Sequence, residues 1–158
     1  MHQPLHLFLQ LTIPLLWIFL VSSCTNSTAR SNTPQELLLF QKTPCYGTCP
    51  AYNATFYSDG TVLYEGLRYV PVQDTLSLRL TKNQLQEVQA TLKDLNHTSL
   101  ENNYLSTFTD IPSSYLTFYK DNKEVKRIKH QQEGPEKLQQ VIKQLHELVM
   151  QLLNERQE

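Results

Sequence analysis

The sequence predicts an α+β domain in which two helices pack on one face of an antiparallel sheet of about five to six strands. Three observations lead to this prediction: short apolar runs joined by tight turns, two segments with helical periodicity, and no strand–helix–strand alternation of the kind that parallel sheets need. The expected order is one strand, a hairpin, another strand, a helix, a second hairpin and a final helix. No glycine-rich phosphate loop occurs, which disfavours the nucleotide-binding folds.

The length and charge of the chain narrow the class of protein further. Its 158 residues are enough for one domain, which we expect over residues 36–155. The 14 basic and 15 acidic residues give a formal net charge of −1. A nucleic-acid binder needs a basic footprint, so we expect no nucleic-acid partner.

The first three strands are predicted from short runs between turn residues. Glu36–Lys42 is an apolar run suited to a buried strand. Ala51–Tyr57 and Thr61–Gly66 flank Ser58-Asp59-Gly60, which is a strong hairpin signal.

The register of this hairpin follows from how its side chains divide between two faces. A three-residue loop with Gly60 in the left-handed conformation pairs Phe56 with Val62 and places Ala54 opposite Tyr64. A two-residue loop would mix apolar and polar side chains on each face, because a slip of one residue turns every side chain over. We therefore expect the bulged register, with Tyr52 extending the apolar face and Asn53, Thr55 and Glu65 sharing the other face.

A further strand and the first helix follow. Thr75–Leu80 alternates, with its leucines on one side. Thr81 and Gln84 match a capping box, in which each side chain satisfies a free backbone N–H of the other residue. An apolar face with helical spacing then predicts a helix over residues 82–95.

The last elements are a second hairpin and a long helix. Ser114–Tyr119 and Glu124–His130 flank the turn Asp121-Asn122-Lys123. Gly134-Pro135-Glu136 opens the final helix, with the proline in its first turn. We expect its apolar stripe to pack on the sheet, and a short heptad seam between two copies is the alternative. The stripe consists of Leu138, Val141, Ile142, Leu145, Leu148, Val149 and Leu152.

The first 23 residues predict export. They contain no Lys, Arg, Asp or Glu, and their apolar run ends in Ser22-Ser23-Cys24. This form is typical of a signal peptide, and Val21-Ser22-Ser23-Cys24 resembles the bacterial lipobox, whose cysteine becomes the lipidated mature N-terminus. An ordinary secreted protein and an uncleaved signal anchor are the alternatives, although an apolar run of about 17 residues is marginal for a membrane span.

Residues 24–35 predict a lipidated cysteine followed by a flexible tether, because small polar residues cannot bury a core. No acidic residue occurs before Glu36. By analogy with known sorting rules, we expect a lipid-anchored cell-envelope protein in the outer membrane, facing the periplasm. Its lipid anchor would make the membrane a partner.

Cys45 and Cys49 are the only cysteines after Cys24. In an oxidising compartment, two cysteines four residues apart are most simply a disulfide, with a stabilising effect of about 2 kcal/mol. A redox-active pair is an alternative, although the spacing is C-x-x-x-C and not C-x-x-C. A metal site would need two further ligands, and the histidines have no paired spacing. We expect no metal and no cofactor.

The residues around this pair resemble a known family. The motif T-P-C-[FY]-G-x-C-P-x-Y runs from Thr43 to Tyr52, followed by Asp-Gly-Thr-Val at 59–62 and Tyr-Glu-Gly at 64–66. Two later segments, residues 109–113 and 134–138, also match the pattern of this family. The chain resembles an uncharacterised domain family of exported bacterial lipoproteins of the Bacteroidetes type over about residues 36–152. The resemblance implies an exported compartment and this type of fold, and it transfers no catalytic residue.

Tyr46, Tyr52, Tyr57 and Asp110 are the candidate binding residues, because aromatic side chains on a rigid sheet are good anchors for a partner. The alternative for the tyrosines is an ordinary strand position with a solvated hydroxyl, and for Asp110 it is an Asx-turn. No known catalytic motif occurs. We therefore expect a non-enzymatic module that binds an envelope protein, a glycan or a small ligand. The alternatives are a thiol–disulfide redox protein using Cys45 and Cys49, or a subunit of an envelope complex docked by the last helix.

Overall fold

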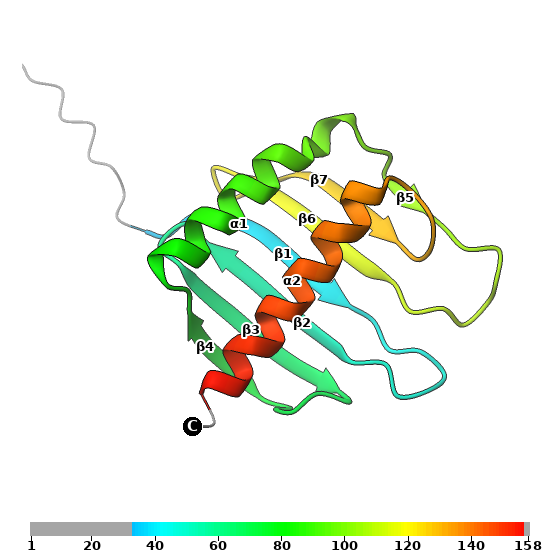
Figure 1. Ribbon diagram of the computed structural model, residues 1–158, viewed down its shortest axis with the longest axis horizontal. Coiled ribbons are helices and arrows are strands. Elements are labelled where there is room, and N and C mark those ends of the chain that lie inside the picture. The colour runs from blue at the N-terminus through cyan, green and yellow to red at the C-terminus, as the bar shows by residue number, and fades with distance from the viewer. Residues whose placement is uncertain (1–32, 157–158) are drawn as a thin grey trace, which may run out of the picture. The chain divides into compact units, whose positions relative to one another are not determined.

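The computed structural model describes residues 33–156, which form a seven-stranded sheet with two helices on one face (Figure 1). The predicted signal segment and Cys24 lie outside the described residues, as does most of the predicted tether. The α+β class and the placement of both helices on one face are as predicted.

The strands follow the order β4-β3-β2-β1-β6-β7-β5 across the sheet. All neighbouring pairs are antiparallel except β5 and β7, which run parallel. The central strand β1 pairs with β2 on one side and with β6 on the other, and so joins the two hairpins. The bounds are β1 Glu36–Lys42, β2 Ala51–Tyr57, β3 Thr61–Arg68, β4 Thr75–Arg79, β5 Asn103–Tyr104, β6 Ser114–Lys120 and β7 Lys123–His130.

The β2–β3 hairpin has the predicted register. Phe56 pairs with Val62 and Ala54 with Tyr64. Gly60 has φ +87°, the left-handed conformation that a glycine adopts without strain, and its N–H donates to the Tyr57 carbonyl at 3.1 Å. Tyr52 extends the same apolar face, as expected.

The β6–β7 hairpin closes on Asp121 and Asn122, whose φ values are +53° and +57°. Two consecutive left-handed residues match the right-handed twist of the flanking strands, and aspartate and asparagine tolerate that conformation well. The pairing shifts by one residue between Phe118 and Tyr119, so this hairpin also contains a bulge.

Helix α1 spans Lys82–Leu95 and begins with the predicted capping box. The Gln84 N–H donates to Thr81 Oγ1 at 3.2 Å, and the Thr81 N–H donates to Gln84 Oε1 at 2.8 Å. Helix α2 spans Glu136–Glu155, with Pro135 at the N-cap and not in the first turn as predicted. Within residues 33–156, neither helix is long and apolar enough to cross a bilayer.

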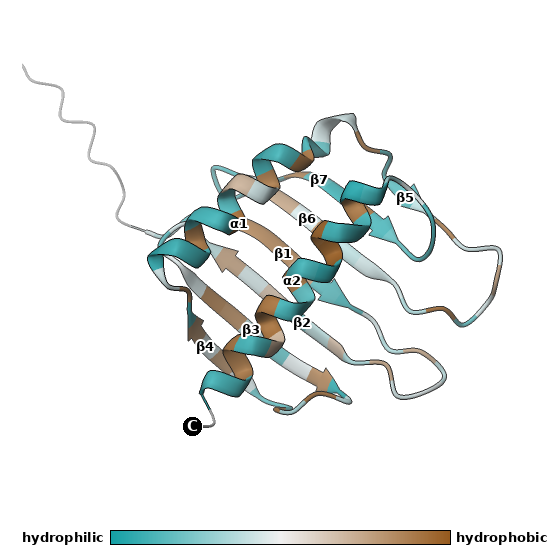
Figure 2. Cartoon of the chain, viewed as in Figure 1, coloured by the Kyte–Doolittle hydropathy of each residue, from teal (hydrophilic) through white to brown (hydrophobic). Residues whose placement is uncertain are grey.

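The core lies between the sheet and the helices. Hydrophobic and hydrophilic residues alternate along both helices, as they do when one side of a helix faces a core (Figure 2). Every residue of the predicted α2 stripe is buried except Leu148, which is half-buried, and Leu153 joins it. This stripe therefore packs on the sheet, as predicted. We call this side of the sheet the covered face and the other side the open face.

The seventh strand was not predicted. Strand β5 has only two residues and lies parallel to the end of β7, where the Gln131 N–H donates to the Tyr104 carbonyl at 2.8 Å. Two residues are too few to show an alternating pattern, so the prediction of five to six strands was too low. The strand order along the chain differs accordingly, with β5 between α1 and the second hairpin.

The two ends of the sheet are different. The chain enters β1 at Glu36, and β1 ends at Lys42 beside the start of β2 and β6. Seven residues of strand span about 20 Å, so the loop that follows β1 lies far from the point of entry. We call the end of the sheet at Lys42 the loop end, because it carries the β1–β2 loop together with the connections at residues 69–74, 105–113 and 131–135.

Candidate functional site

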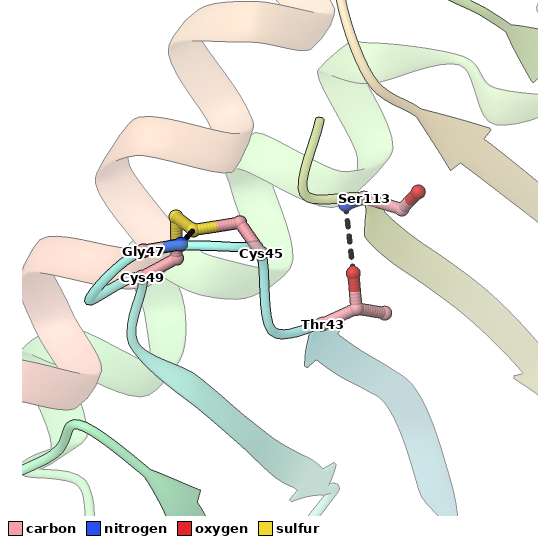
Figure 3. Close-up of a disulfide and its surroundings, with 5 residues drawn as sticks. All are labelled: Thr43, Cys45, Gly47, Cys49 and Ser113. Carbon is pink, nitrogen blue, oxygen red and sulfur yellow. Dashed lines mark hydrogen bonds between the residues drawn. A yellow bond between two sulfur atoms is a disulfide. The ribbon is translucent and has the colours of Figure 1, made fainter. Parts of the chain in front are cut away.

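The β1–β2 loop is closed by a disulfide between Cys45 and Cys49, whose Cα atoms are 5.6 Å apart (Figure 3). The predicted disulfide is therefore confirmed. The Gly47 N–H points back to Cys45 Sγ at 3.2 Å, which tightens the turn. Tyr46 stands between the two cysteines with 97% of its surface exposed. The loop thus presents one aromatic ring on a short cross-linked support.

The root of this loop is fixed to the connection that precedes β6. The Ser113 N–H donates to Thr43 Oγ1 at 2.8 Å (Figure 3). In addition, the Thr43 N–H donates to the Ser113 carbonyl at 2.9 Å. Ser113 is buried. The same connection carries Asp110, which is exposed and has φ +64°, a conformation that aspartate adopts more readily than most residues. Two segments far apart in sequence are therefore held together at the loop end.

The large exposed apolar side chains gather at the loop end. Of the seven in residues 33–156, five lie in or beside its connections, and the remaining two lie on strands β3 and β7. Besides Tyr46, the most exposed is Phe108 at 68%. Aromatic side chains of this kind form the anchors of many protein interfaces. The five are Tyr46, Leu67, Tyr69, Leu105 and Phe108.

Tyr52 lies in the core. Its side chain is fully buried on the covered face, where a 2.8 Å hydrogen bond joins its hydroxyl to His146 Nδ1 and the two rings stack. Burial raises the pKa of Tyr52, and the nearby Tyr64 adds to this. Burial also lowers the pKa of His146, helped by the charge of Lys42 and opposed by Glu147. The ring of Tyr52 is out of reach of a partner.

Tyr57 lies at the other end of the sheet, opposite Glu36. Burial raises its pKa, and the negative charge of Glu36 adds to this. Of the four candidate binding residues, the structure therefore exposes Tyr46 and Asp110 at the loop end, buries Tyr52 under the helices and places Tyr57 at the opposite end of the sheet.

The open face carries a polar cluster that the sequence prediction missed. Five side chains lie directly opposite one another on five neighbouring strands. The alternation of β2 and β3 indicated that Asn53 and Glu65 share a face. The pairing of β1 with β6 adds Tyr115 and, through β7, Lys129. This pairing joins segments far apart in the chain, so it leaves no local signal in the sequence. We call this set the open-face row, and it consists of Glu65, Asn53, Gln41, Tyr115 and Lys129.

Hydrogen bonds link much of this row. Asn53 Nδ2 donates to Glu65 Oε2 at 2.8 Å, and Gln41 Nε2 donates to Asn53 Oδ1 at 2.9 Å. Arg127, from the neighbouring position on β7, donates from Nη2 to Gln41 Oε1 at 3.4 Å. A shallow hollow of about 350 Å³ lies between the row and the root of the disulfide loop, lined in part by Thr43 and Pro44.

Together these features define a two-layer α+β domain whose most distinctive local element is a loop closed by a disulfide. Within residues 33–156, no group of three or more His, Cys, Asp or Glu side chains is arranged to hold a metal ion. The chain belongs to a family described as a domain of unknown function (DUF6438), which matches residues 36–149. The match begins at the first residue of β1 and ends within α2, so it covers the whole sheet. No curated protein and no solved structure matches the chain.

Proposed function

We propose that this protein is a lipid-anchored, non-enzymatic binding module of the cell envelope that holds a partner protein at its loop end. The observation that carries the proposal is Tyr46, which exposes 97% of its surface on a disulfide-closed loop. Covering an exposed aromatic ring with a partner makes the free energy of binding more favourable. Tyrosine is also among the residues most enriched in interface hot spots.

The rigidity of the loop supports the proposal. The disulfide, the flanking Pro44 and Pro50, and the two hydrogen bonds between Thr43 and Ser113 all restrict its motion. Association costs conformational entropy when a partner must order a mobile loop. A loop that is already ordered avoids much of that cost.

The direction of the chain also supports the proposal. The chain enters the domain at Glu36, at the end of β1 away from the disulfide loop. A tether formed by residues 25–35, attached to a lipidated Cys24, would therefore join the domain opposite its loop end. A flexible tether at that end would leave the loop end free to meet a partner in the periplasm, where disulfides persist.

The anchor is tested by the intact mass of the protein extracted from membranes, measured before and after reduction. We expect a chain that begins at Cys24, carries the added mass of acyl chains and gains two hydrogens on reduction. A chain that still begins at Met1, or one that begins at another residue without lipid, would rule out the anchor.

The partner is tested by placing a photoreactive phenylalanine at position 46 in the native envelope, with the same residue at Lys123 as the matched control. Lys123 is exposed at the opposite end of the sheet. We expect a discrete cross-linked species from position 46 alone. Added domain should compete for it, and the Tyr46→Ser domain should not. Equal cross-linking from both positions, or none from position 46, contradicts the proposal.

A thiol–disulfide redox function is the second candidate. It is favoured by the Gly47 N–H, which would stabilise a thiolate on Cys45 if the disulfide were reduced. Titration with a dithiol of known potential tests it. A redox protein should exchange readily and lose thiol-exchange activity in Cys45→Ser, whereas a structural disulfide should resist mild reductants.

Docking by the last helix has less support, because the leucines that would form the docking face already pack on the sheet. Leu145 and Leu152 are 3% and 5% exposed. A partner that used them would have to displace α2 from the core.

A further inference from the structure

The guanidinium of Arg127 is held in place on the open face by three contacts. Its Nε donates to Thr117 Oγ1 at 3.1 Å, and Thr117 is fully buried. Its Nη2 donates to Gln41 Oε1, and its guanidinium carbon lies 5.7 Å from the centre of the Tyr115 ring. These hydrogen bonds use one side of the guanidinium and leave the Nη1 hydrogens and one Nη2 hydrogen without a partner in residues 33–156. A carboxylate binds such a pair of N–H groups with two parallel hydrogen bonds.

The charge around Arg127 is unbalanced. Lys129 lies on the same strand with its Nζ 6.0 Å from the Tyr115 ring centre, so two cations share one ring. Among the described residues, neither cation has a carboxylate within 4.0 Å. By contrast, Arg79 at the other side of the same face pairs with Asp59 at 3.2 Å. The β7 side of the open-face row therefore favours an anionic ligand.

The two amides of the row, Gln41 and Asn53, offer neutral hydrogen-bonding groups in fixed positions. The hydrogen bonds run in one direction, from Arg127 through Gln41 and Asn53 to Glu65. Each amide is oriented by its neighbours and keeps a second N–H and a second acceptor position. Strands are about 4.8 Å apart, so the five positions of the row extend over about 19 Å. Oriented planar groups at such intervals suit the hydroxyls of consecutive sugar rings.

We propose that the open face binds a linear oligosaccharide that contains uronate residues. One carboxylate binds Arg127 beside Lys129, and ring hydroxyls bind Gln41, Asn53 and Glu65. The hollow of about 350 Å³ next to the row accepts part of the sugar. An acidic peptide fits less well, because its side chains present no hydroxyls to the oriented amides of Gln41 and Asn53 or to the carboxylate of Glu65. This site uses neither the lipid anchor nor Tyr46.

The proposal is tested by calorimetric titration of the full chain in detergent with tetrasaccharides of galacturonate, of mannuronate and of glucuronate. The same tetrasaccharides with methyl-esterified carboxylates are the controls. We expect at least one acid form to bind and its methyl ester to lose that binding. Arg127→Gln should weaken binding about tenfold, which corresponds to the loss of one charge-assisted contact. Lys129→Gln is the second variant and should weaken it less.

Arg79→Gln is the matched control, because Arg79 lies on the same face and is paired with Asp59. It should leave the affinity unchanged, as should Tyr46→Ser, which separates this site from the proposed protein partner. Thermal unfolding checks that each variant is folded. The proposal is overturned if no acid tetrasaccharide binds at millimolar concentration, if Arg127→Gln and Lys129→Gln both bind normally, if Arg79→Gln weakens binding as much as Arg127→Gln does, or if hexaglutamate displaces the sugar at equal concentration.

Discussion

On the covered face the strands bury Phe40, Tyr52 and Leu116, while on the open face the same strands present Leu39, Asn53 and Tyr115. The first set is packed under two helices, and the second lies within reach of solvent or a ligand. Consecutive residues of one strand therefore lie in different environments, one in the core and the next on the open face. Substitutions on the covered face should change stability, and substitutions on the open face should change binding.

The largest expected difference concerns an apolar side chain on each face. Phe40→Ala removes a fully buried ring and leaves a cavity, so it should lower the free energy of unfolding by about 3–5 kcal/mol. Leu63→Ala, where the side chain is 42% exposed on the open face, should cost less than about 1 kcal/mol. Urea unfolding monitored by circular dichroism gives both values. Similar losses for the two variants would mean that the open face is also covered.

Two tyrosines give the next comparison. Tyr52→Phe removes the hydroxyl that bonds His146 Nδ1 and leaves that nitrogen half-buried without a partner, which should cost about 1–3 kcal/mol. Tyr115→Phe on the open face should change stability by no more than about 0.5 kcal/mol. The same unfolding experiment measures both. If Tyr52→Phe left the free energy of unfolding unchanged, the hydrogen bond to His146 would not stabilise the fold.

Acid should lower the stability of the domain by a smaller amount. Burial lowers the pKa of His146 and of His97, helped by the positive charges of Lys42 and Lys126 respectively, with Glu147 acting against the shift at His146. The unfolded chain, with histidine pKa values near about 6.5, then binds more protons than the folded one, so stability falls as the pH drops through that value. The melting temperature should be lower at about pH 5.5 than at about pH 7.5.

The variants His146→Gln and His97→Gln provide the control for this pH dependence. Each should reduce the difference in melting temperature between the two pH values, whatever its own stability at neutral pH. A melting temperature that does not change, or that rises in acid, would contradict the burial of these imidazoles as neutral groups.

Lys129→Gln should also have only a small effect on stability. Its ammonium lies 6.0 Å from the centre of the Tyr115 ring on the open face, and such contacts at exposed sites contribute about 0.5–1 kcal/mol at most. Urea unfolding should show a change within that range, although sugar binding by the same variant should weaken. A larger loss of stability would mean that Lys129 is needed to stabilise the fold.

Local patterns were sufficient to predict most of the individual elements. The left-handed Gly60 of the first hairpin, the capping box at Thr81 and the apolar stripe of α2 each depend on residues close together in the sequence, and each is present as predicted. The disulfide was also predictable, because Cys45 and Cys49 are only four residues apart.

The candidate binding surfaces were harder to predict because they depend on distant strand pairings. The register of the first hairpin placed Tyr52 on its apolar face, yet only the packing of α2 shows that this face is the closed one. Arg127 and Gln41 are 86 residues apart and meet because β1 pairs with β6 and β6 with β7. Strand β5 is too short to leave a pattern. The Thr43–Ser113 contact that roots the disulfide loop has the same long-range origin.

The central position of β1 has a mechanical consequence. A pull applied between Glu36 and the disulfide loop acts along the axis of this strand, which is hydrogen-bonded to β2 on one side and to β6 on the other. Such a load is a shear, and it strains the bonds of both ladders together instead of opening them one after another. A domain stretched between a tether and a bound partner would therefore resist unfolding, because the load would act along a strand that is hydrogen-bonded on both sides.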